Sequence, residues 1–586
     1  MNRYIKTLLA ATLALPMLTS CLEETFPTSG ATQEQVDQAD KSYIVNSIPA
    51  YLHKFTSGVN YDCGMAGLNI WRDASTADLP IYSNSYDYFS YVASGITLGS
   101  QWALSQYVWE RYYGLIQKTN LAIQTISAEL DSEGGIKSED AEAACTACAY
   151  RANAYMEMAQ WYEYKLTGFE AFDSKAKADG IMGLTVPIVT ENTTEAEGRN
   201  NPRAPFYKLY RFVLTDLNNG ERYMYGMNEP DNKAFCGLGV IYGLQARLWQ
   251  LLGTRFELHP EDLSTALSHE DDADIPYDKF GVTTARECFE LAASYARKAI
   301  NSGYSPVTET QWFDPTTGFN TVSNSWMWAD IISSDDGLAK NLVWTSWVSF
   351  MSPEASYGIA CSDYNGYRMI DNRLFDIIPD SDWRKTTWIA PDDVGKEEAF
   401  NTKYARGTSL GYKDWSKYQA YAGFKFHPAN GDKDISTSGN AVSIPIMRVE
   451  EMYLIEAECA GRAYGVGEGR ALLEAFVNGY RYKDGSYKST GEGLEGLIDD
   501  VFTQKRIELW GEGQILWDYR RLEKAIIKGY PGTNWPELYR LNSLPNYVAP
   551  WTTFSLPQSE RDYNPAVILN PDPSQGVYYF PWTEDE

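Results

Sequence analysis

A group of charged residues near the C-terminus could carry chemistry, because carboxylates beside bases can act as general acids and bases. Its members are Lys505, Arg506, Glu508, Glu512, Asp518 and Arg521. The same spacing suits another role, since mixed charges on neighbouring helix turns form ion pairs that hold helices together. Gly511 and Gly513 also mark a helix end within the motif. We therefore interpret it as a structural ion-pair network, and we predict no catalytic residues.

Cysteine and histidine show no pattern of a metal or redox site. Of the 8 cysteines, Cys21 ends the apolar N-terminal segment, and the other seven are scattered along the chain. Cys145 and Cys148 form a C-x-x-C pair about two turns into a predicted helix, beyond the first turn where a thiolate would be stabilised. We expect these thiols to be buried core groups. The 4 histidines are far apart, so we predict neither a metal site nor a cofactor.

The first 21 residues have the pattern of an export signal. Arg3 and Lys6 precede the apolar run 8–18, which is too short to span a bilayer, since spanning takes about 20 apolar residues. Leu18-Thr19-Ser20-Cys21 then resembles a bacterial lipobox, in which the cysteine is lipidated and becomes the mature N-terminus. We predict a signal peptide at 1–20 and lipidation of Cys21. The alternative is an ordinary signal peptide with an incidental cysteine.

Residues 21–40 are polar and read as a lipidated, flexible tether between the membrane and the folded chain. Glu23 and Glu24 resemble the acidic signal that directs lipoproteins of the Bacteroidetes group to the outer face of the cell. The sequence therefore predicts a lipid-anchored, surface-exposed protein of the cell outer membrane.

Composition limits the partners of the 586-residue chain. Its net charge is −28, with 78 acidic against 50 basic residues, and removing Arg3 and Lys6 makes it about −30. Such a charge repels nucleic-acid phosphates, so we expect no nucleic-acid partner. Aromatic residues make up 14% of the chain, including 18 Trp and 42 Tyr. This excess suggests amphipathic rings at a wet surface and favours neutral ligands.

The elements that must position these residues are mainly helices. Apolar residues recur at helical spacing in five segments: 109–126, 138–165, 205–218, 235–252 and 292–300. In the last, Gly303 suits the left-handed position after a helix, and the segment 292–306 resembles the second helix of a tetratricopeptide unit. We predict a mainly α fold, a tetratricopeptide-like scaffold of helix hairpins with long irregular loops. The expected loops are 71–102, 168–201, 256–283, 305–341, 351–443 and 530–586.

Several motifs occur together in the order typical of one family. They are Trp109-Glu110-Arg111-Tyr112-Tyr113, Tyr150-Arg151-Ala152-Asn153-Ala154-Tyr155, the runs 183–189, 444–448 and 450–458, Lys505-Arg506-Ile507-Glu508-Leu509, Glu512-Gly513 and Leu556-Pro557. Behind a lipobox, this order resembles the SusD/RagB family of outer-membrane nutrient-binding lipoproteins. One departure is Asn341-Leu342-Val343-Trp344, where the family usually has an acidic residue after the asparagine.

The resemblance implies a SusD-like globular domain over 41–586, with an N-terminal helical scaffold part over 41–303 and a C-terminal part over 304–586. It implies a binding protein, not an enzyme, that captures glycans at the cell surface. Its partner would be a SusC-like TonB-dependent transporter that receives the glycan. A peptide-binding, RagB-like role and, less favoured, a secreted helical glycoside hydrolase stay open as alternatives. A hydrolase would need two carboxylates about 5–10 Å apart, and no pair stands out.

Two aromatic-rich segments are the candidate ligand contacts, because flat rings stack on the C–H faces of sugars and neighbouring polar groups bind the hydroxyls. The first comprises Trp71, Arg72, Asp73, Tyr86 and Trp102. The second comprises Trp312, Asn320, Trp326 and Trp328. For each aromatic residue the alternative is a loop anchor packed on the scaffold, since burial alone stabilises a large ring.

Overall fold

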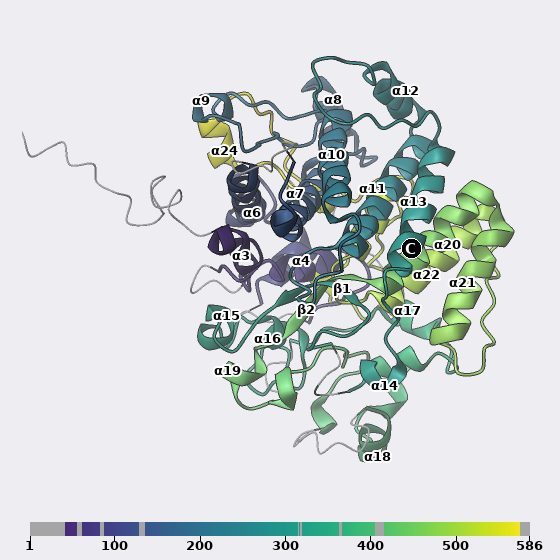
Figure 1. Ribbon diagram of the computed structural model, residues 1–586. Helices are drawn as coiled ribbons and strands as arrows, with labels where there is room; N and C mark the ends of the chain where they lie inside the picture. The colour runs from purple at the N-terminus through teal and green to yellow at the C-terminus, as the bar shows by residue number, and fades with distance from the viewer. Residues whose placement is uncertain are drawn as a thin grey trace, which may run out of the picture. The chain divides into compact units, whose positions relative to one another are not determined.

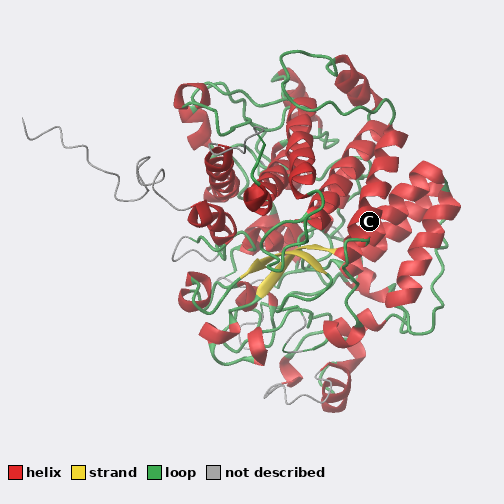
Figure 2. Cartoon of the chain, viewed as in Figure 1, coloured by secondary structure: helices red, strands yellow, loops and turns green. Residues whose placement is uncertain are grey.

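The computed structural model describes residues 41–55, 61–82, 87–127, 135–314, 316, 319–361, 366–404 and 415–574. Figure 2 shows that helices dominate, with one strand pair in the described part. The N-terminal helices are α3 (Lys41–Leu52), α4 (Gly67–Ser75), α5 (Phe89–Ser94), α6 (Ala103–Ser127), α7 (Ala141–Tyr162), α8 (Glu170–Ala178), α9 (Glu195–Gly198), α10 (Phe206–Met224), α11 (Leu238–Leu258), α12 (Pro260–Ser268) and α13 (Ala285–Ile300).

The second half of the chain has shorter elements before its last long helices. They are α14 (Glu309–Trp312), β1 (Trp326–Ile331), α15 (Gly337–Asn341), α16 (Trp347–Met351), α17 (Asn372–Asp376), α18 (Glu397–Ala399), α19 (Ser436–Gly439), β2 (Ser443–Arg448), α20 (Val449–Tyr464), α21 (Val466–Tyr480), α22 (Gly493–Glu508), α23 (Ile515–Arg521) and α24 (Gln558–Tyr563).

The long helices pack one against the next in a single array. Contacts run from α6 to α7, α10, α11, α13, α20 and α21, with α22 also on α20, and Figure 1 shows this succession of coiled ribbons. Small residues on α7 let its neighbours approach closely: Ala147, Ala152 and Ala159 are fully buried. The result is the helix-hairpin scaffold that the sequence predicts.

Local sequence fixes where α13 begins and ends. The hydroxyl of Thr284 accepts a hydrogen bond from the backbone N–H of Glu287, and the Glu287 carboxylate accepts one from the backbone N–H of Thr284. This reciprocal capping box satisfies two donors at the helix start. After the helix, Gly303 has a φ of 93°, which confirms the left-handed conformation expected there.

The two strands join segments far apart in the chain. β1 pairs antiparallel with β2, with Asp330 opposite Ile444 and Ile331 opposite Ser443. β1 contacts α7, because the rings of Trp328 and Tyr150 meet edge-on at 4.6 Å, and Figure 1 shows the two strands as a crossing pair of arrows. β2 runs directly into α20, so the pairing attaches the loop-rich segment between the strands to the helical array.

The predicted helices correspond to α6, α7, α10, α11 and α13, with ends that differ by several residues. The predicted loops hold more structure than expected. Trp71, Arg72 and Asp73 lie on α4, Trp312 ends α14, and Trp326 and Trp328 lie on β1. A nine-residue helix and a six-residue strand give too short a periodic pattern to stand out in a sequence rich in aromatic residues.

Candidate functional site

The first predicted group divides between the core and the surface. Trp71, Arg72 and Asp73 are buried on α4. Arg72 Nη1 donates to a Glu157 carboxylate oxygen at 2.7 Å, which ties α4 to α7. Asp73 accepts a hydrogen bond from the backbone N–H of Gly513 at 2.9 Å, and burial raises its pKa to about 8. These side chains hold α4 in place, and Arg72 also lines an internal cavity of about 50 Å³ together with Trp328 of β1. Their burial favours the anchor alternative.

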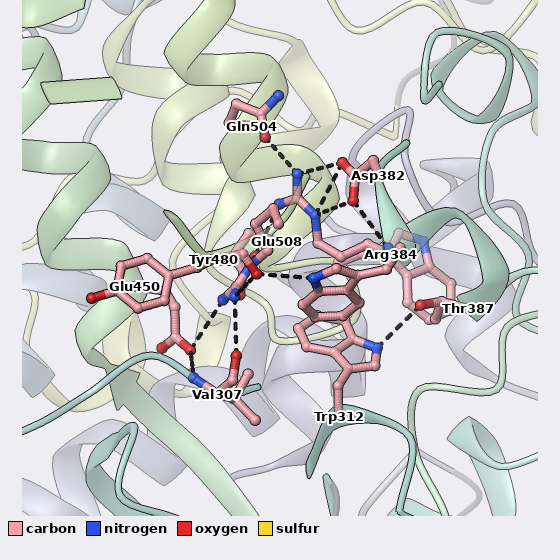
Figure 3. Close-up of polar contacts among 12 residues, drawn as sticks. Val307, Trp312, Asp382, Arg384, Thr387, Glu450, Tyr480, Gln504 and Glu508 are labelled. Carbon is pink, nitrogen blue, oxygen red and sulfur yellow. Dashed lines mark hydrogen bonds and ion pairs between the residues drawn. The ribbon is translucent and has the colours of Figure 1, made fainter. Parts of the chain in front are cut away.

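The second predicted group is also buried. Trp312, Trp326 and Trp328 are at most 1% exposed, and Asn320 is 2% exposed. The indole N–H of Trp312 donates to the hydroxyl of Thr387 at 3.1 Å, as Figure 3 shows. The amide of Asn320 donates to the carbonyl oxygen of Pro428 at 2.8 Å. The burial of these side chains again favours loop anchors, and as ligand contacts they stay a prediction.

A cluster of buried ion pairs lies next to Trp312, since the guanidinium of Arg448 is 5.8 Å from the centre of the Trp312 ring. Glu508 on α22 contacts Arg384, Arg448 and Arg481 at 2.7–3.1 Å, and all four side chains are at most 1% exposed. Figure 3 shows the Arg384 guanidinium shared between Asp382, Gln504 and Glu508. Although burial opposes ionisation, Arg481 and Arg448 hold the pKa of Glu508 well below its ordinary value.

The remaining members of the C-terminal charged motif are ion-paired as well. Lys505 contacts Asp518 at 2.9 Å, and Arg521 contacts Glu458 of α20 at 2.5 Å. These pairs join α22, α23 and α20, which confirms the interpretation of the motif as a structural network. The buried, unbridged thiols of Cys145 and Cys148 confirm the prediction for that pair.

A line of aromatic rings leads from the core to the surface. Trp71 stacks on Tyr107 with ring centroids 5.7 Å apart, and Tyr107 meets Tyr61 edge-on at 5.4 Å. Tyr61 contacts Tyr88 at 6.3 Å, and Tyr88 stacks on Tyr91 at 5.2 Å. Trp71 is fully buried, whereas Tyr91 is 38% exposed. We call these five residues the aromatic ladder. Its outer end is the stacked pair of Tyr88, just before α5, and Tyr91, on α5.

Two tryptophans are also exposed. Among the described side chains, Trp102 and Trp344 are the exposed tryptophans, each at 48%. Trp102 directly precedes α6, and Trp344 lies three residues before α16. α5 and α16 are in contact, because the rings of Phe89 and Phe350 meet edge-on at 4.8 Å. We use the term exposed aromatic surface for Tyr91, Trp102 and Trp344, which are 38–48% exposed, together with the partly buried Tyr88 that stacks on Tyr91. Tyr91 lies on α5, whereas Trp102 and Trp344 lie just before α6 and α16.

Sequence reasoning singled out Trp102 but missed Tyr91 and Trp344 as contacts. Trp344 drew notice only as part of a motif departure, and nothing in its neighbours marks it as exposed. Cys21 and Tyr86 lie outside the described residues. Within the described residues, no group of three or more metal-ligating side chains comes together, and no helix is long and apolar enough to cross a membrane.

Comparison with known proteins places the chain. Residues 301–586 match the model of the SusD family. A SusD-like carbohydrate binding protein from Bacteroides vulgatus is 18% identical, with a TM-score of 0.64 over 90% of this chain and 96% of that one. The surface glycan-binding protein A from Bacteroides thetaiotaomicron, solved in complex with laminarihexaose, is 16% identical, with a TM-score of 0.58 over 92% and 100% of the two chains.

No match was found among curated proteins. The structural likeness nevertheless extends through both halves of the chain, well beyond the segment that the family model matches. This protein is therefore SusD-like: residues 301–586 carry the SusD family sequence pattern, and the described chain has the fold of SusD superfamily proteins.

Proposed function

We propose that this protein is a non-catalytic, cell-surface lipoprotein that captures an oligosaccharide or polysaccharide and delivers it to a SusC-like TonB-dependent transporter. The observation that carries the proposal is the exposed aromatic surface, in which the rings of Tyr91, Trp102 and Trp344 are 38–48% exposed at or just before helices of the frame. The laminarihexaose complex of a protein with the same fold supports a glycan as the ligand class.

The surface suits weak and reversible capture. Tyr88 and Tyr91 offer a stacked pair of rings to the C–H faces of a sugar, and Trp102 and Trp344 offer two further platforms. An open surface leaves sugar hydroxyls in contact with water, so each hydrogen bond adds only about 0.5–1.5 kcal/mol. We expect a Kd in the micromolar to millimolar range. Such an affinity allows the glycan to pass on to a transporter.

Affinity electrophoresis and calorimetry against a panel of polysaccharides test the proposal. We expect at least one neutral glycan to bind, and binding to fall in Trp102→Ala and Trp344→Ala. Tyr225→Ala is a matched control, since Tyr225 is an 82% exposed aromatic residue after α10, outside the exposed aromatic surface. If every glycan fails and peptides bind instead, the ligand class is wrong. New reducing ends after long incubation with a bound glycan would show a hydrolase.

The membrane part of the proposal rests on Cys21 and the sequence before it. A lipid anchor and a polar tether would keep the binding domain beside its transporter at a high local concentration. We expect Cys21→Ala to remove the protein from the cell surface and to impair glycan uptake. Surface labelling of whole cells and co-purification with an outer-membrane barrel test this. Normal surface display of Cys21→Ala would contradict the anchor.

A further inference from the structure

A cleft of about 310 Å³ opens beside the start of α12 and shares no residue with the exposed aromatic surface. Its walls include Lys165, Leu166, Met182, Phe206, Tyr207 and His259. A small cavity of about 30 Å³ continues it inward, toward Arg520, and both spaces are lined by Glu163, Lys165 and Arg255. The cleft therefore has an apolar mouth and a charged inner end.

The carboxylates at the inner end already have cationic partners. Arg255 Nη1 contacts Glu163 at 2.7 Å, and Arg255 Nε lies 2.7 Å from a carboxylate oxygen of Asp262. His259 Nε2 lies 2.6 Å from Glu523, and this hydrogen bond raises the pKa of His259, which favours its charged form. The negative charge of the inner end is thus largely neutralised within the cleft.

Lys165 is placed differently. Its ammonium lies 3.7 Å from the nearest Glu163 oxygen, which is beyond hydrogen-bond distance, and its side chain is 22% exposed to the cleft. Burial and the neighbouring Arg255 lower the pKa of Lys165 from its ordinary value. This cation is therefore only partly compensated by the acids around it and has room for an acceptor from outside.

Arg520 adds a second positive charge behind the cleft. Its guanidinium donates to the carbonyl oxygens of Thr552 and Glu163 at 2.8 and 3.2 Å and to two threonine hydroxyls. These acceptors are neutral, and burial lowers the pKa of Arg520 to about 10. Lys165, Arg255, His259 and Arg520 face four carboxylates, those of Glu163, Glu261, Asp262 and Glu523. The charges balance in number, but neither Lys165 nor Arg520 is hydrogen-bonded to a carboxylate of the described residues, so an anionic group from outside has its place at Lys165.

The residues at the mouth and rim of the cleft indicate which other groups the ligand carries. Leu166 and Phe206 supply apolar contacts, and Tyr207 is held by stacking on His269 with ring centroids 4.3 Å apart. At the rim, the carboxylate of Glu261, whose side chain is 74% exposed, can accept hydrogen bonds from ligand hydroxyls. C–H faces, several hydroxyl donors and one carboxylate on a single ring are the features of a uronic acid.

We propose that the α12 cleft binds a uronic-acid unit, with the carboxylate on Lys165 and the sugar ring against Leu166, Phe206 and Tyr207. The cleft is a second site, separate from the exposed aromatic surface. It would let the protein hold an acidic branch or end of a glycan whose neutral part lies on the aromatic rings, or bind an acidic oligosaccharide by itself.

Calorimetry with methyl glucuronoside and methyl glucoside tests the cleft. We expect the uronoside to bind at least tenfold more tightly than the neutral glycoside, and its affinity to fall as salt is raised. Lys165→Gln should weaken uronoside binding at least tenfold, while Lys165→Arg keeps most of it. Lys175→Gln is the matched control, because Lys175 is a 60% exposed lysine of α8 that pairs with Asp179. Equal affinities for the two glycosides, or full binding by Lys165→Gln, would overturn the proposal.

Two further measurements separate this site from others. Trp102→Ala and Trp344→Ala should leave uronoside affinity unchanged, whatever they do to neutral glycans, because neither residue lines the cleft. A loss of uronoside binding in these variants would move the acidic ligand to the aromatic surface and overturn the proposal. N-acetyl-leucine, which has a carboxylate but no sugar hydroxyls, should bind at least tenfold more weakly than the uronoside. Equal binding would show a peptide-terminus site instead.

Discussion

Trp312, Trp326 and Trp328 are buried in the core, whereas Trp102 and Trp344 lie at the surface just before α6 and α16. Both sets come from aromatic-rich segments between long helices, so composition does not separate them. The difference is in what surrounds each ring. The ammonium of Lys425 and the guanidinium of Arg448 lie 4.7 and 5.8 Å from the ring centre of Trp312. A ring that packs against buried cations serves stability, and an uncovered ring remains available to a ligand.

Among the changes that test this difference between buried and exposed regions, the largest loss of unfolding free energy is expected for a substitution of Glu508. Glu508→Ala would leave Arg384, Arg448 and Arg481 without their shared carboxylate and should cost about 3–5 kcal/mol of unfolding free energy. Urea denaturation followed by tryptophan fluorescence measures it. Glu261→Ala, at a 74% exposed carboxylate, is the control and should change stability by less than about 0.5 kcal/mol. A loss below about 1 kcal/mol for Glu508→Ala would mean that the cluster does not hold the region together.

The buried and exposed tryptophans can be compared directly. Trp328→Ala should cost about 3 kcal/mol, because it empties a fully buried site next to Tyr150, whose ring centroid is 4.6 Å away. Trp344→Ala should cost less than about 0.5 kcal/mol, because its ring is half exposed. Thermal and urea unfolding of the two variants give both values. Equal losses would remove the distinction between the two regions.

A smaller loss of stability is expected when the pH is raised and His53 loses its proton. Burial disfavours its charged form, but contacts with Asp330 on β1 and with Asp336 raise the pKa of His53 to about 9. A folded pKa above the unfolded value of about 6.5 means that the contribution is complete below pH 6.5 and is lost as pH rises through 9. We expect about 2 kcal/mol of stability to disappear between pH 6.5 and 10.

His53→Gln provides the control for that prediction. The difference in unfolding free energy between the wild-type protein and His53→Gln should be largest near pH 6 and smallest near pH 10. Urea titrations at several pH values measure it. A difference that stays constant over this range would show that His53 does not change its protonation on unfolding.

The smallest change in free energy is expected for Trp102→Ala, and it should affect glycan binding rather than stability. Trp102→Ala should weaken glycan binding about tenfold, or about 1.4 kcal/mol, with stability changed by less than about 0.5 kcal/mol. Calorimetry on the glycan identified by the panel measures the first value, and urea unfolding the second. Trp312→Phe is a useful counterpart, because it should lower stability and leave affinity unchanged. Unchanged affinity in Trp102→Ala would remove this ring from the binding surface.

The sequence predicted the helical array well because its signals are local. Apolar residues at helical spacing and the turn at Gly303 depend on residues within a few positions of each other. The capping box of Thr284 and Glu287 is also local, but it was not predicted, so the expected segment began at 292 instead of 285. The burial of Trp71 and Arg72 could not be read in this way. Arg72 pairs with Glu157, and the next residue, Asp73, binds the backbone of Gly513, which is hundreds of positions away in the sequence. For an aromatic residue in a short segment, the neighbouring residues in the sequence do not show whether the ring is buried or exposed.

The same limit applies to the α12 cleft. Its cationic side chains include Lys165, Arg255 and Arg520. These residues belong to three separate parts of the chain, and no motif connects them. Within the C-terminal charged motif, by contrast, the mixed signs were enough to predict ion pairs, because residues such as Lys505 and Asp518 lie on neighbouring helices.

The pairing of β1 with β2 bears on how new specificities could arise in such a protein. It closes the base of the segment that carries Trp344, since Ile331 and Ser443 face each other where that segment leaves and re-enters the frame. The entropy of closing a loop grows only slowly with its length. Insertions and deletions at exposed turns between these two positions are therefore inexpensive for folding. Evolution can therefore vary the exposed turns of this stretch while Arg384 and Lys425, which lie within it, keep their ion pairs with Glu508 and Glu512.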